Sequence, residues 1–550
     1  MRTLIILWIS SVLPACGLQV ESARWGFNGK VVAERVNVLN VLVYNDTGQA
    51  SNGDLQLVQT SGIGRIDAIL ARADYLGPGQ RRWVQFTPYV GTHSSGNWQL
   101  RWGRDGRDRH QLSAPDVGAR AVVVLQPRAV QPGRRKLPGY AENLFPPTVC
   151  ATDALAGVVL GHMPEWEPTR EAAFLDWLFR GGVVHLAETD GGVPLRFEGA
   201  LALLNQPGAR FRHGNGHIVR HRVRVSELTP ALLAASGFRI PGTSQQPLKQ
   251  NYSMRNSSQN LFRLLGSCVS PQHNWTLIYI LAGLYLILIA PVNYLIGRKA
   301  KRHWLSLGFF LALVTVFSII MSVIGRKGYG TESRTFAVGY ARDLGNGRAD
   351  VTQWATAFVA KRNRYKIVSD AQQSILSAAQ PNESVDGVIR NGPKAEFDVD
   401  VPVYSKRQFL HRGVWELATP VVSVQGGTYT VKSDLELLDV ILWQGGKLQR
   451  TSKNGNIFSG ARAIDYYGHT RIANGKDVTE IPHLELLAVA VDGLEISGQR
   501  EELPPLTDGQ QHVFVSVLAP DSLSPARTFG DYRGVITFHC IAQVAGDVEE

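Results

Sequence analysis

The sequence predicts a multidomain protein in which α/β and all-β parts flank a two-helix transmembrane hairpin. Three observations lead to this fold class. The chain has 550 residues, which is too long for a single hydrophobic core. Two uncharged apolar runs, 275–297 and 304–324, stand back to back in its middle. On both sides of them, short alternating apolar and polar segments are separated by turn-forming residues, as expected of β-strands.

Each apolar run is long enough to cross a bilayer as a helix. At about 1.5 Å per residue the first spans about 34 Å and the second about 31 Å, against a hydrocarbon core of about 30 Å. The turn between them, 298–303, holds four basic residues. Because basic loops stay in the cytoplasm, we expect both flanks on the other side of the membrane. The predicted location is the bacterial inner membrane, with large periplasmic N- and C-terminal domains.

The first 17 residues have the features of a secretory signal peptide, with Met1-Arg2 before an apolar core at 4–13. The following Leu13-Pro14-Ala15-Cys16-Gly17 resembles a bacterial lipoprotein box, in which Cys16 would become the lipidated first residue. The alternative is ordinary cleavage after Gly17. Both alternatives predict export, which agrees with the orientation inferred from the basic turn.

Composition separates this chain from several protein classes. With 44% hydrophobic and 19% charged residues it is neither disordered nor a polytopic channel. The net charge of +11 would suit binding to nucleic acid. The predicted topology, however, places the folded parts outside the cytoplasm, away from nucleic acid. We expect contacts to the bilayer and to an envelope protein instead. Four widely separated cysteines exclude a zinc ribbon or a dense disulfide framework. A single Cys150–Cys268 bridge and free buried thiols remain the two alternatives.

Residues 24–115 are expected to form an immunoglobulin-like β-sandwich. Alternating runs such as 36–43 and 83–86 are interrupted by turn clusters at 45–48 and 77–79, with the spacing of antiparallel strands. A module of this kind usually binds a partner or acts as a spacer between other domains.

The sequence pattern changes to that of an α/β domain over 118–245. Continuous apolar runs at 121–125 and 157–161 are typical of strands buried on both faces of a parallel sheet. Pro168 suits the first turn of an amphipathic helix that ends before the strand 183–187. Thr229 is expected to cap a second helix.

The stretch 155–188 resembles the glutamine amidotransferase-like domains of exported membrane proteins. The matching features are an apolar strand, Pro164, Leu175-Asp176-Trp177-Leu178, Gly181-Gly182 and a second apolar strand. The resemblance implies a flavodoxin-like domain of degenerate class I amidotransferase type. A working amidotransferase needs a cysteine nucleophile on a tight turn after a strand, and here Glu188-Thr189-Asp190 follows the strand 183–187 instead. We therefore expect no amidotransferase catalysis.

Polar residues at the ends of two predicted strands are the candidate ligand-binding residues. His162 and Glu165 follow one strand, and Glu188 and Asp190 follow another. Because crevices of open α/β sheets lie at the carboxyl ends of strands, these side chains either converge on a ligand or are caps and solvated loop residues. Convergence would make the domain a ligand-binding sensor or a hydrolase-like enzyme, with His162 as its base or ligand.

No motif indicates a metal or another cofactor. His213, His217 and His221 have the spacing of ligands on a helix, but glycines at 214 and 216 break that helix. The alternation over 218–224 predicts a strand instead. The sequence has no glycine-rich nucleotide loop, His-Glu-x-x-His or Gly-x-Ser-x-Gly motif.

Residues 331–545 are expected to form a β-rich extracytoplasmic domain. Alternating segments at 335–338, 397–401 and 512–517 predict strands. The polar tract 369–391 is expected to be either a long surface loop or an excursion between domains.

The order of these parts resembles uncharacterised bacterial envelope membrane proteins of planctomycete type, which have no settled activity. Together with the missing nucleophile, the resemblance implies a membrane-tethered binding or scaffolding protein and no enzyme. Within the hairpin, Asn293 is the candidate contact to a partner helix. The alternative is that Asn293 satisfies a carbonyl freed by Pro291.

Overall fold

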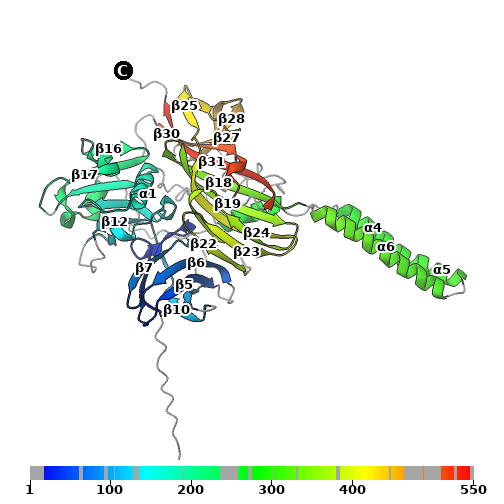
Figure 1. Cartoon of the computed structure of the whole chain (residues 1–550). Coiled ribbons are helices and arrows are strands. Elements are labelled where there is room, and N and C mark those ends of the chain that lie inside the picture. Colours follow the sequence, from blue (N-terminus) through cyan, green and yellow to red (C-terminus); the bar gives the residue numbers. More distant parts are fainter. Residues whose placement is uncertain are drawn as a thin grey trace, which may run out of the picture.

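The computed structural model describes residues 18–60, 66–91, 97–103, 106–127, 136–189, 191–235, 258–269, 275–300, 303–329, 332–378, 384–444, 447–463, 487, 510–525 and 529–544. The predicted signal peptide with Cys16, and the crevice candidate Asp190, lie outside these residues. The protein is mixed α/β, with several sheets packed into one body and a two-helix hairpin that projects from it (Figure 1).

The N-terminal module is a sandwich of two sheets, as the alternating sequence predicts. Its smaller sheet has the order β1 (Leu18–Trp25), β4 (Leu39–Asn45), β7 (Arg81–Phe86). The larger sheet begins with β10 (Asp108–Leu112), β9 (Asn97–Trp102), β5 (Ser51–Thr60) and β6 (Ile66–Leu76). Alternate residues such as Val41, Leu57 and Leu100 point between the sheets and are fully buried there. Two short pairs close the module: β2 (Lys30–Val31) with β11 (Asp116–Val117), and β3 (Arg35–Val36) with β8 (Tyr89–Val90).

The larger sheet continues into strands that follow the hairpin in the sequence. β6 pairs in parallel with β22 (Gly387–Arg390), and the order then runs through β23 (Glu396–Val401) to β20 (Asn363–Val368). The first four strands of this sheet precede the hairpin and the last three follow it. One sheet therefore contains strands from both sides of the hairpin.

The polar tract 369–391 crosses between two sheets. It contains β21 (Gln372–Ala378), which pairs with a strand of the C-terminal sheet, and β22, which pairs with the sandwich. The surface-loop alternative is therefore wrong, because Ile375, Leu376 and Ile389 are buried and give this polar sequence an apolar face. The structure agrees with the alternative of an excursion between domains.

The α/β domain is a six-stranded sheet with one helix on each face. Its order is β13 (Gly139–Ala141), β12 (Ala121–Gln126), β14 (Leu155–Leu160), β15 (Val183–Glu188), β17 (Gly216–Arg224), β16 (Arg210–His213). All neighbours are parallel except the β16–β17 pair, so the first five strands have the flavodoxin-type order. Helix α1 (Pro168–Phe179) buries Phe174 and Trp177 on one face, and α2 (Pro230–Ala235) buries Leu233 on the other. Leu232 N–H donates to Thr229 Oγ1 at 3.1 Å, so Thr229 caps α2 as predicted.

The C-terminal module is an eleven-stranded sheet, part of which closes on itself. The open part is β21, β24 (Ser405–Glu416), β19 (Arg348–Val359), β18 (Arg334–Gly345) and β31 (Asp531–Val544). The order then continues through β25 (Val421–Gln425), β26 (Thr428–Lys432), β29 (Ile457–Ala463), β28 (Lys447–Asn454), β27 (Leu437–Gln444) and β30 (Gln510–Leu518). Because β30 also pairs with β31, the strands from β31 to β30 close into a barrel. Buried side chains such as Phe458, Val515 and Phe538 fill it.

The hairpin consists of two antiparallel helical runs that are long and apolar enough to cross a membrane, Trp275–Arg298 and Trp304–Gly325. The first run is α4 (Trp275–Ile287), a π-helical turn (Leu288–Val292) at Pro291, and α5 (Asn293–Ala300). The second run is α6 (His303–Tyr329). Residues 298–300 and 303, which were predicted to be part of the turn, therefore belong to the helices. Exposed aromatic rings lie near both ends, as in proteins with membrane-interface belts: Trp275, Tyr279, Tyr294 and Trp304.

Helix α3 (Ser258–Cys268) packs the segment before the hairpin onto the folded body. Its apolar face, Leu261, Phe262 and Leu265, is completely or almost completely buried against the C-terminal sheet. The side-chain amide of Gln408 also donates to the backbone carbonyl of Phe262 at 2.9 Å. The chain is thus attached to the body shortly before it enters the first helix of the hairpin.

Candidate functional site

The predicted crevice of the α/β domain contains one close polar pair. His162 follows β14, and its Nε2 lies 2.7 Å from Oε2 of Glu142, a residue that follows β13, on the other side of β12 in the sheet. The Glu142 side chain is 7% exposed, and its backbone carbonyl accepts a hydrogen bond from Trp166 Nε1–H at 2.9 Å. Glu142 was missed in the sequence because β13 is only three residues long and gives no periodic signal.

The other crevice candidates do not join this pair. Glu165 is exposed, and Glu188 is half-buried at the end of β15. Among the described residues, no contact links His162 to Glu165 or Glu188. The described part of the chain also holds no group of three or more His, Cys, Asp or Glu side chains suited to a metal ion. Among the described crevice candidates, His162 is thus the one with a carboxylate partner, Glu142.

The predicted strand at 218–224 is confirmed as part of β17, and it positions a histidine pair. His221 Nε2 lies 3.0 Å from His185 Nδ1 on the neighbouring β15. Burial and the adjacent His221 lower the pKa of His185 to about 3, and burial also lowers the pKa of His221. Both rings are therefore neutral near pH 7, and one N–H is shared between them.

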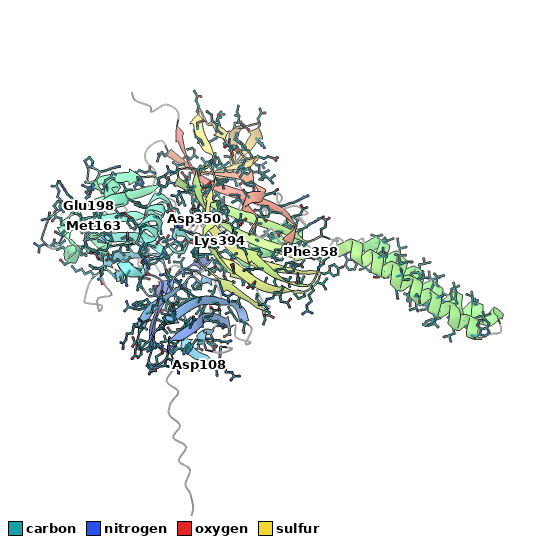
Figure 2. All side chains as sticks on the ribbon, in the orientation of Figure 1. Asp108, Met163, Glu198, Asp350, Phe358 and Lys394 are labelled. Atoms are coloured by element: carbon teal, nitrogen blue, oxygen red, sulfur yellow. The ribbon has the colours of Figure 1, made fainter. Side chains whose placement is uncertain are left out.

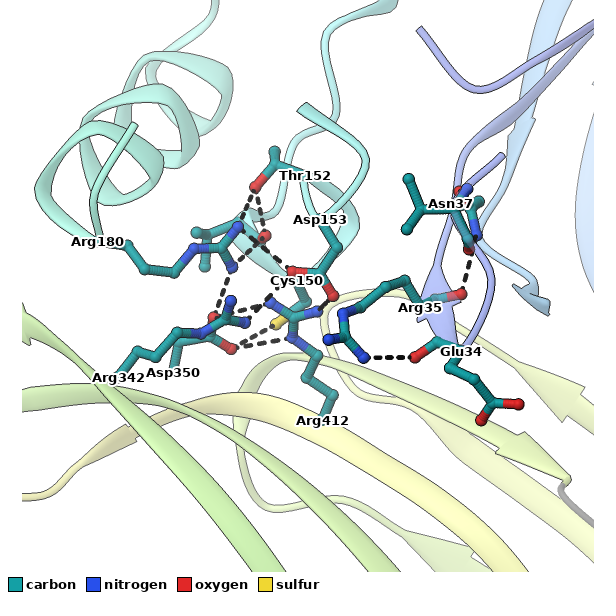
Figure 3. A network of polar contacts seen from close by, with 12 residues as sticks. Glu34, Arg35, Asn37, Cys150, Thr152, Asp153, Arg180, Arg342, Asp350 and Arg412 are labelled. Carbon is teal, nitrogen blue, oxygen red and sulfur yellow. Dashed lines mark hydrogen bonds and ion pairs between the residues drawn. The ribbon is translucent and has the colours of Figure 1, made fainter. Parts of the chain in front are cut away.

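A buried cluster of five ionised side chains lies between the α/β domain and the C-terminal sheet (Figure 3). We call it the charge cluster. Asp350 lies at this junction in the view of the whole chain (Figure 2). Two members come from the α/β domain and three from the C-terminal sheet: Asp153 and Arg180, then Arg342, Asp350 and Arg412.

Asp350 is the centre of the charge cluster, and its side chain is fully buried. Its Oδ2 accepts hydrogen bonds from Arg180 at 2.6 Å, from Arg412 at 2.8 Å and from Arg342 at 2.9 Å. Asp153 accepts from Arg412 and, at 3.3 Å, from Arg342. Asp350 therefore binds one guanidinium group of the opposite module, and Asp153 binds two.

Local structure explains why these residues meet. Arg180 is the C-cap residue that directly follows α1, and a positive charge is favourable at the C-terminus of a helix. Arg342 on β18 lies directly opposite Asp350 on β19, and Arg412 on β24 lies opposite Thr352, two residues from Asp350. Side chains at such positions share one face of a sheet and lie within reach of one another.

The guanidinium groups of the charge cluster keep its two carboxylates ionised. Burial alone would raise the pKa of Asp153 and of Asp350, but the three guanidinium groups outweigh it and hold both pKa values below the usual range. Burial lowers the pKa of Arg180 to about 10, which leaves it charged at neutral pH.

Cys150 lies beside the charge cluster but is not a nucleophile there. Its Sγ is 4.0 Å from Oδ1 of Asp350. Burial, followed by the charge of Asp350, raises the pKa of the thiol to about 12. A protonated, fully buried thiol is inert. The arrangement is suited to joining modules and unsuited to acid–base or thiol chemistry.

The sandwich also reaches this junction. A cavity of about 20 Å³, room for one water molecule, is lined by Arg35 and Tyr89 of the sandwich together with Asp153 and Arg412. Next to it, the carboxylate of Glu34 accepts hydrogen bonds from Tyr89 Oη at 2.6 Å and from Ser258 N–H, at the start of α3, at 3.0 Å.

Two further contacts join the α/β domain to the C-terminal module. Arg348 on β19 forms an ion pair with Asp176 on α1 at 2.7 Å, and Arg212 on β16 donates to Gln510 on β30 at 3.0 Å. The junction therefore extends along several elements of both modules.

Asn293, the hairpin candidate, finds its partner inside the hairpin. Its Oδ1 accepts a hydrogen bond from Ser306 Oγ on α6 at 2.9 Å. The backbone N–H of Asn293, and not its side chain, bonds to the carbonyls of Leu288 and Ala290 around Pro291. The partner helix of Asn293 is thus the second helix of the same chain.

Comparisons with known proteins give no family for this chain. No family model and no curated protein matches it. Among solved structures, it is similar to a cycloisomaltooligosaccharide glucanotransferase of Paenibacillus sp. in complex with cycloisomaltoheptaose, at 12% sequence identity and a TM-score of 0.16. That match covers 31% of this chain and 27% of the other. Likeness of this size establishes neither a shared fold nor a shared function.

Proposed function

We propose that this chain is a membrane-tethered binding or scaffolding protein of the bacterial envelope that works without catalysis. Its folded body lies on the periplasmic side of the inner membrane, and the basic turn of the hairpin lies in the cytoplasm. The N-terminus directs export, either as a cleaved signal peptide or through lipidation of Cys16.

The observation that carries this proposal is the construction of one body from both flanks of the hairpin. Arg180 and Asp153 precede the two apolar helices, and Asp350 and Arg412 follow them, yet all four share buried ion pairs. Strands from both flanks also pair within the larger sheet of the sandwich. Flanks that fold together must lie on the same side of the membrane, which requires an even number of crossings. The basic residues at 298–302 favour a cytoplasmic position for the turn of the hairpin. The folded flanks would then lie on the other side of the membrane.

The chemistry of the described sites supports binding rather than catalysis. In the charge cluster, the pKa values of Asp153 and Asp350 lie below the usual range, and the thiol of the neighbouring Cys150 is protonated. In the α/β crevice, His162 is paired with Glu142, and no contact among the described residues joins it to Glu188. A sensor or enzyme using this crevice has less support, because its described candidates His162, Glu165 and Glu188 share no contact.

In-cell crosslinking tests the scaffold proposal. Cells that express the tagged full-length chain are treated with an amine-reactive crosslinker that enters the cell, and the chain is purified and its crosslinks mapped. We expect an envelope protein linked to exposed lysines of the folded body, such as Lys361, Lys394 and Lys432.

The lysines of the turn, Lys299 and Lys301, are the internal control for the same experiment. Recovery of the chain without a partner would contradict the scaffold proposal. Partners linked only through the turn would contradict it as well, because they would place the binding surface in the cytoplasm.

A further inference from the structure

Two neighbouring turns, 360–362 and 402–404, lie at the end of the C-terminal module from which the hairpin projects. We call them the root turns. The first joins β19 to β20, and the second joins β23 to β24. The backbone N–H of Tyr404 donates to the carbonyl of Val359 at 2.8 Å, which holds the two turns side by side. Phe358, the next residue along β19, lies at the root of the hairpin (Figure 2).

Short connections keep the root turns close to any bilayer that contains the hairpin. Helix α6 ends at Tyr329 and β18 begins at Arg334, so the chain between them spans at most about 17 Å. On the other side, α3 is packed on the body and ends at Cys268, and α4 begins at Trp275, at most about 24 Å away. Arg334 lies opposite Phe358, close to the end of β19 that leads into the first root turn. The root turns therefore lie on the side of the body that faces the membrane.

The second root turn presents apolar side chains to its surroundings. Val403 is 47% exposed and Tyr404 is 38% exposed, and Pro402 before them is exposed as well. Tyr404 also has a φ of 54°, in a backbone region that bulky residues rarely adopt. Such conformations occur mainly at functional sites, where the surrounding structure enforces them. Tyrosine is enriched where proteins meet the membrane–water interface, so this tip suits contact with lipid headgroups.

Basic side chains accompany this apolar tip. Lys361, Arg362 and Arg364 are exposed in the first root turn and directly after it. Arg362 forms an ion pair with Asp400 at 3.5 Å, but its side chain is 73% exposed, and ion pairs with such exposure are weak. Guanidinium groups bind phosphate oxygens through paired hydrogen bonds. The first root turn is therefore suited to anionic headgroups.

We propose that the root turns dock on the surface of the bilayer that holds the hairpin. Val403 and Tyr404 enter the headgroup region, and the two arginines bind the phosphodiester groups of anionic phospholipids. Glu332 and Asp531 are exposed at the neighbouring ends of β18 and β31, so attraction by charge alone is weak and the apolar tip supplies the rest of the binding. The docking rests on insertion of the hairpin, as proposed above, and fixes the orientation of the body on the membrane.

Photocrosslinking to lipid tests the docking on the full chain. The photoreactive residue p-benzoylphenylalanine replaces Val403 or, in a separate preparation, Leu284, which is exposed on α4 and reports insertion of the hairpin. Both proteins are placed in nanodiscs of phosphatidylcholine, with or without an equal part of phosphatidylglycerol, and lipid adducts are identified by mass spectrometry. We expect adducts at both positions. Phosphatidylglycerol should raise the yield at position 403 about threefold and leave the yield at position 284 unchanged.

Two controls separate docking from chance contact. Val421 is an equally apolar, exposed residue of β25, a strand that pairs with the far end of β31, so p-benzoylphenylalanine in its place should give no lipid adduct. The double variant Arg362→Glu/Arg364→Glu should lower the adduct yield at position 403 about fivefold in nanodiscs with phosphatidylglycerol, because phosphate binding is lost. The yield at position 284 should not change in this variant.

Adducts at position 284 with none at position 403, or equal yields at positions 403 and 421, would overturn the docking and leave the membrane tether intact. Absence of adducts at position 284 would instead contradict insertion of the hairpin, and with it both proposals. Crosslinking of position 403 to a protein in place of lipid, in intact cells, would also overturn the docking. Should the double variant fail to fold, as seen by circular dichroism, the lipid comparison decides: equal yields at position 403 with and without phosphatidylglycerol contradict binding to anionic headgroups.

Discussion

The guanidinium of Arg180 lies 2.6 Å from the carboxylate of Asp350, 170 residues later in the chain and beyond both apolar helices of the hairpin. Both side chains are nearly or completely buried, at 7% and 0% exposure. An ion pair removed from water in this way is costly to break, because the remaining charge stays buried without a partner. The contact therefore makes the two flanks of the hairpin parts of one folded unit.

Removal of Asp350 should destabilise this unit strongly. Asp350→Ala leaves three guanidinium groups buried with only Asp153, and we expect a loss of about 3–5 kcal/mol in the free energy of unfolding. Urea unfolding of the purified chain in nanodiscs measures it. Glu396→Ala is the control, because Glu396 forms an exposed ion pair with Lys366 at 2.9 Å and should cost less than about 1 kcal/mol. Equal losses in both variants would show that the charge cluster does not hold the flanks together.

The free energy of unfolding should fall as the pH is lowered from 7 to 5, because buried histidines resist protonation in the folded chain. Burial lowers the pKa of His411 to about 3, below its ordinary value of 6.5, so the unfolded chain binds a proton in this range and the folded chain does not. The stabilisation is complete above about pH 6.5 and is lost as the pH falls toward 3, on the order of 2 kcal/mol for one histidine at pH 5. Asp153 and Asp350 lose their contribution only below their ordinary pKa of 3.8.

The variant His411→Gln isolates this effect, because the amide can still bond to Ser369, which lies 2.6 Å from His411 in the wild type. We expect urea unfolding at pH 7 and pH 5 to show a smaller pH-dependent loss in the variant than in the wild type. The same loss in both proteins would contradict the assignment to His411.

The hydrogen bond between Asn293 and Ser306 should couple the two helices of the hairpin. In a double-mutant cycle with Asn293→Ala and Ser306→Ala, we expect a coupling energy of about 0.6–1.7 kcal/mol for the separation of the helices in the bilayer. Steric trapping of the doubly tagged hairpin helices in the full chain measures it. Zero coupling, with Asn293→Ala alone destabilising, would mean that Asn293 contacts a different helix.

The three described cysteines lie outside any disulfide, and their thiols should differ in reactivity. Cys150 and Cys540 are buried, and burial raises the pKa of both thiols, whereas Cys268 is partly exposed. N-ethylmaleimide should therefore modify Cys268 first in the native protein and the other two only after denaturation. Mass spectrometry of the labelled chain distinguishes this order from a Cys150–Cys268 disulfide, which would leave both residues unlabelled until reduction.

Elements with a local pattern could be predicted from the sequence. The hairpin follows from two uncharged runs, α1 from its apolar stripe after Pro168, and α2 from Thr229 and Pro230. These features depend on residues close together in the chain, so spacing and composition are sufficient to find them.

The junction between modules could not be predicted, because its members are single charges on separate elements. Arg342, Asp350 and Arg412 each occur within a long strand, where a charged residue is usually solvent-exposed. The only signal is their position: in β19, Asp350 stands among residues that are mostly buried. The pairing of β6 with β22 and the closure of β30 on β31 are likewise long-range contacts that leave no local pattern.

Cysteine accessibility at the hairpin turn tests the central claim, that one body assembled from both flanks lies outside the cytoplasm. Lys301→Cys places a thiol in the turn, and Ser452→Cys places one at an exposed position of β28 in the C-terminal module. A maleimide that crosses the outer but not the inner membrane is applied to intact cells, with the parent chain as the background for native thiols. We predict labelling of Ser452→Cys in intact cells and of Lys301→Cys only after the inner membrane is permeabilised. Labelling of Lys301→Cys in intact cells would contradict the account.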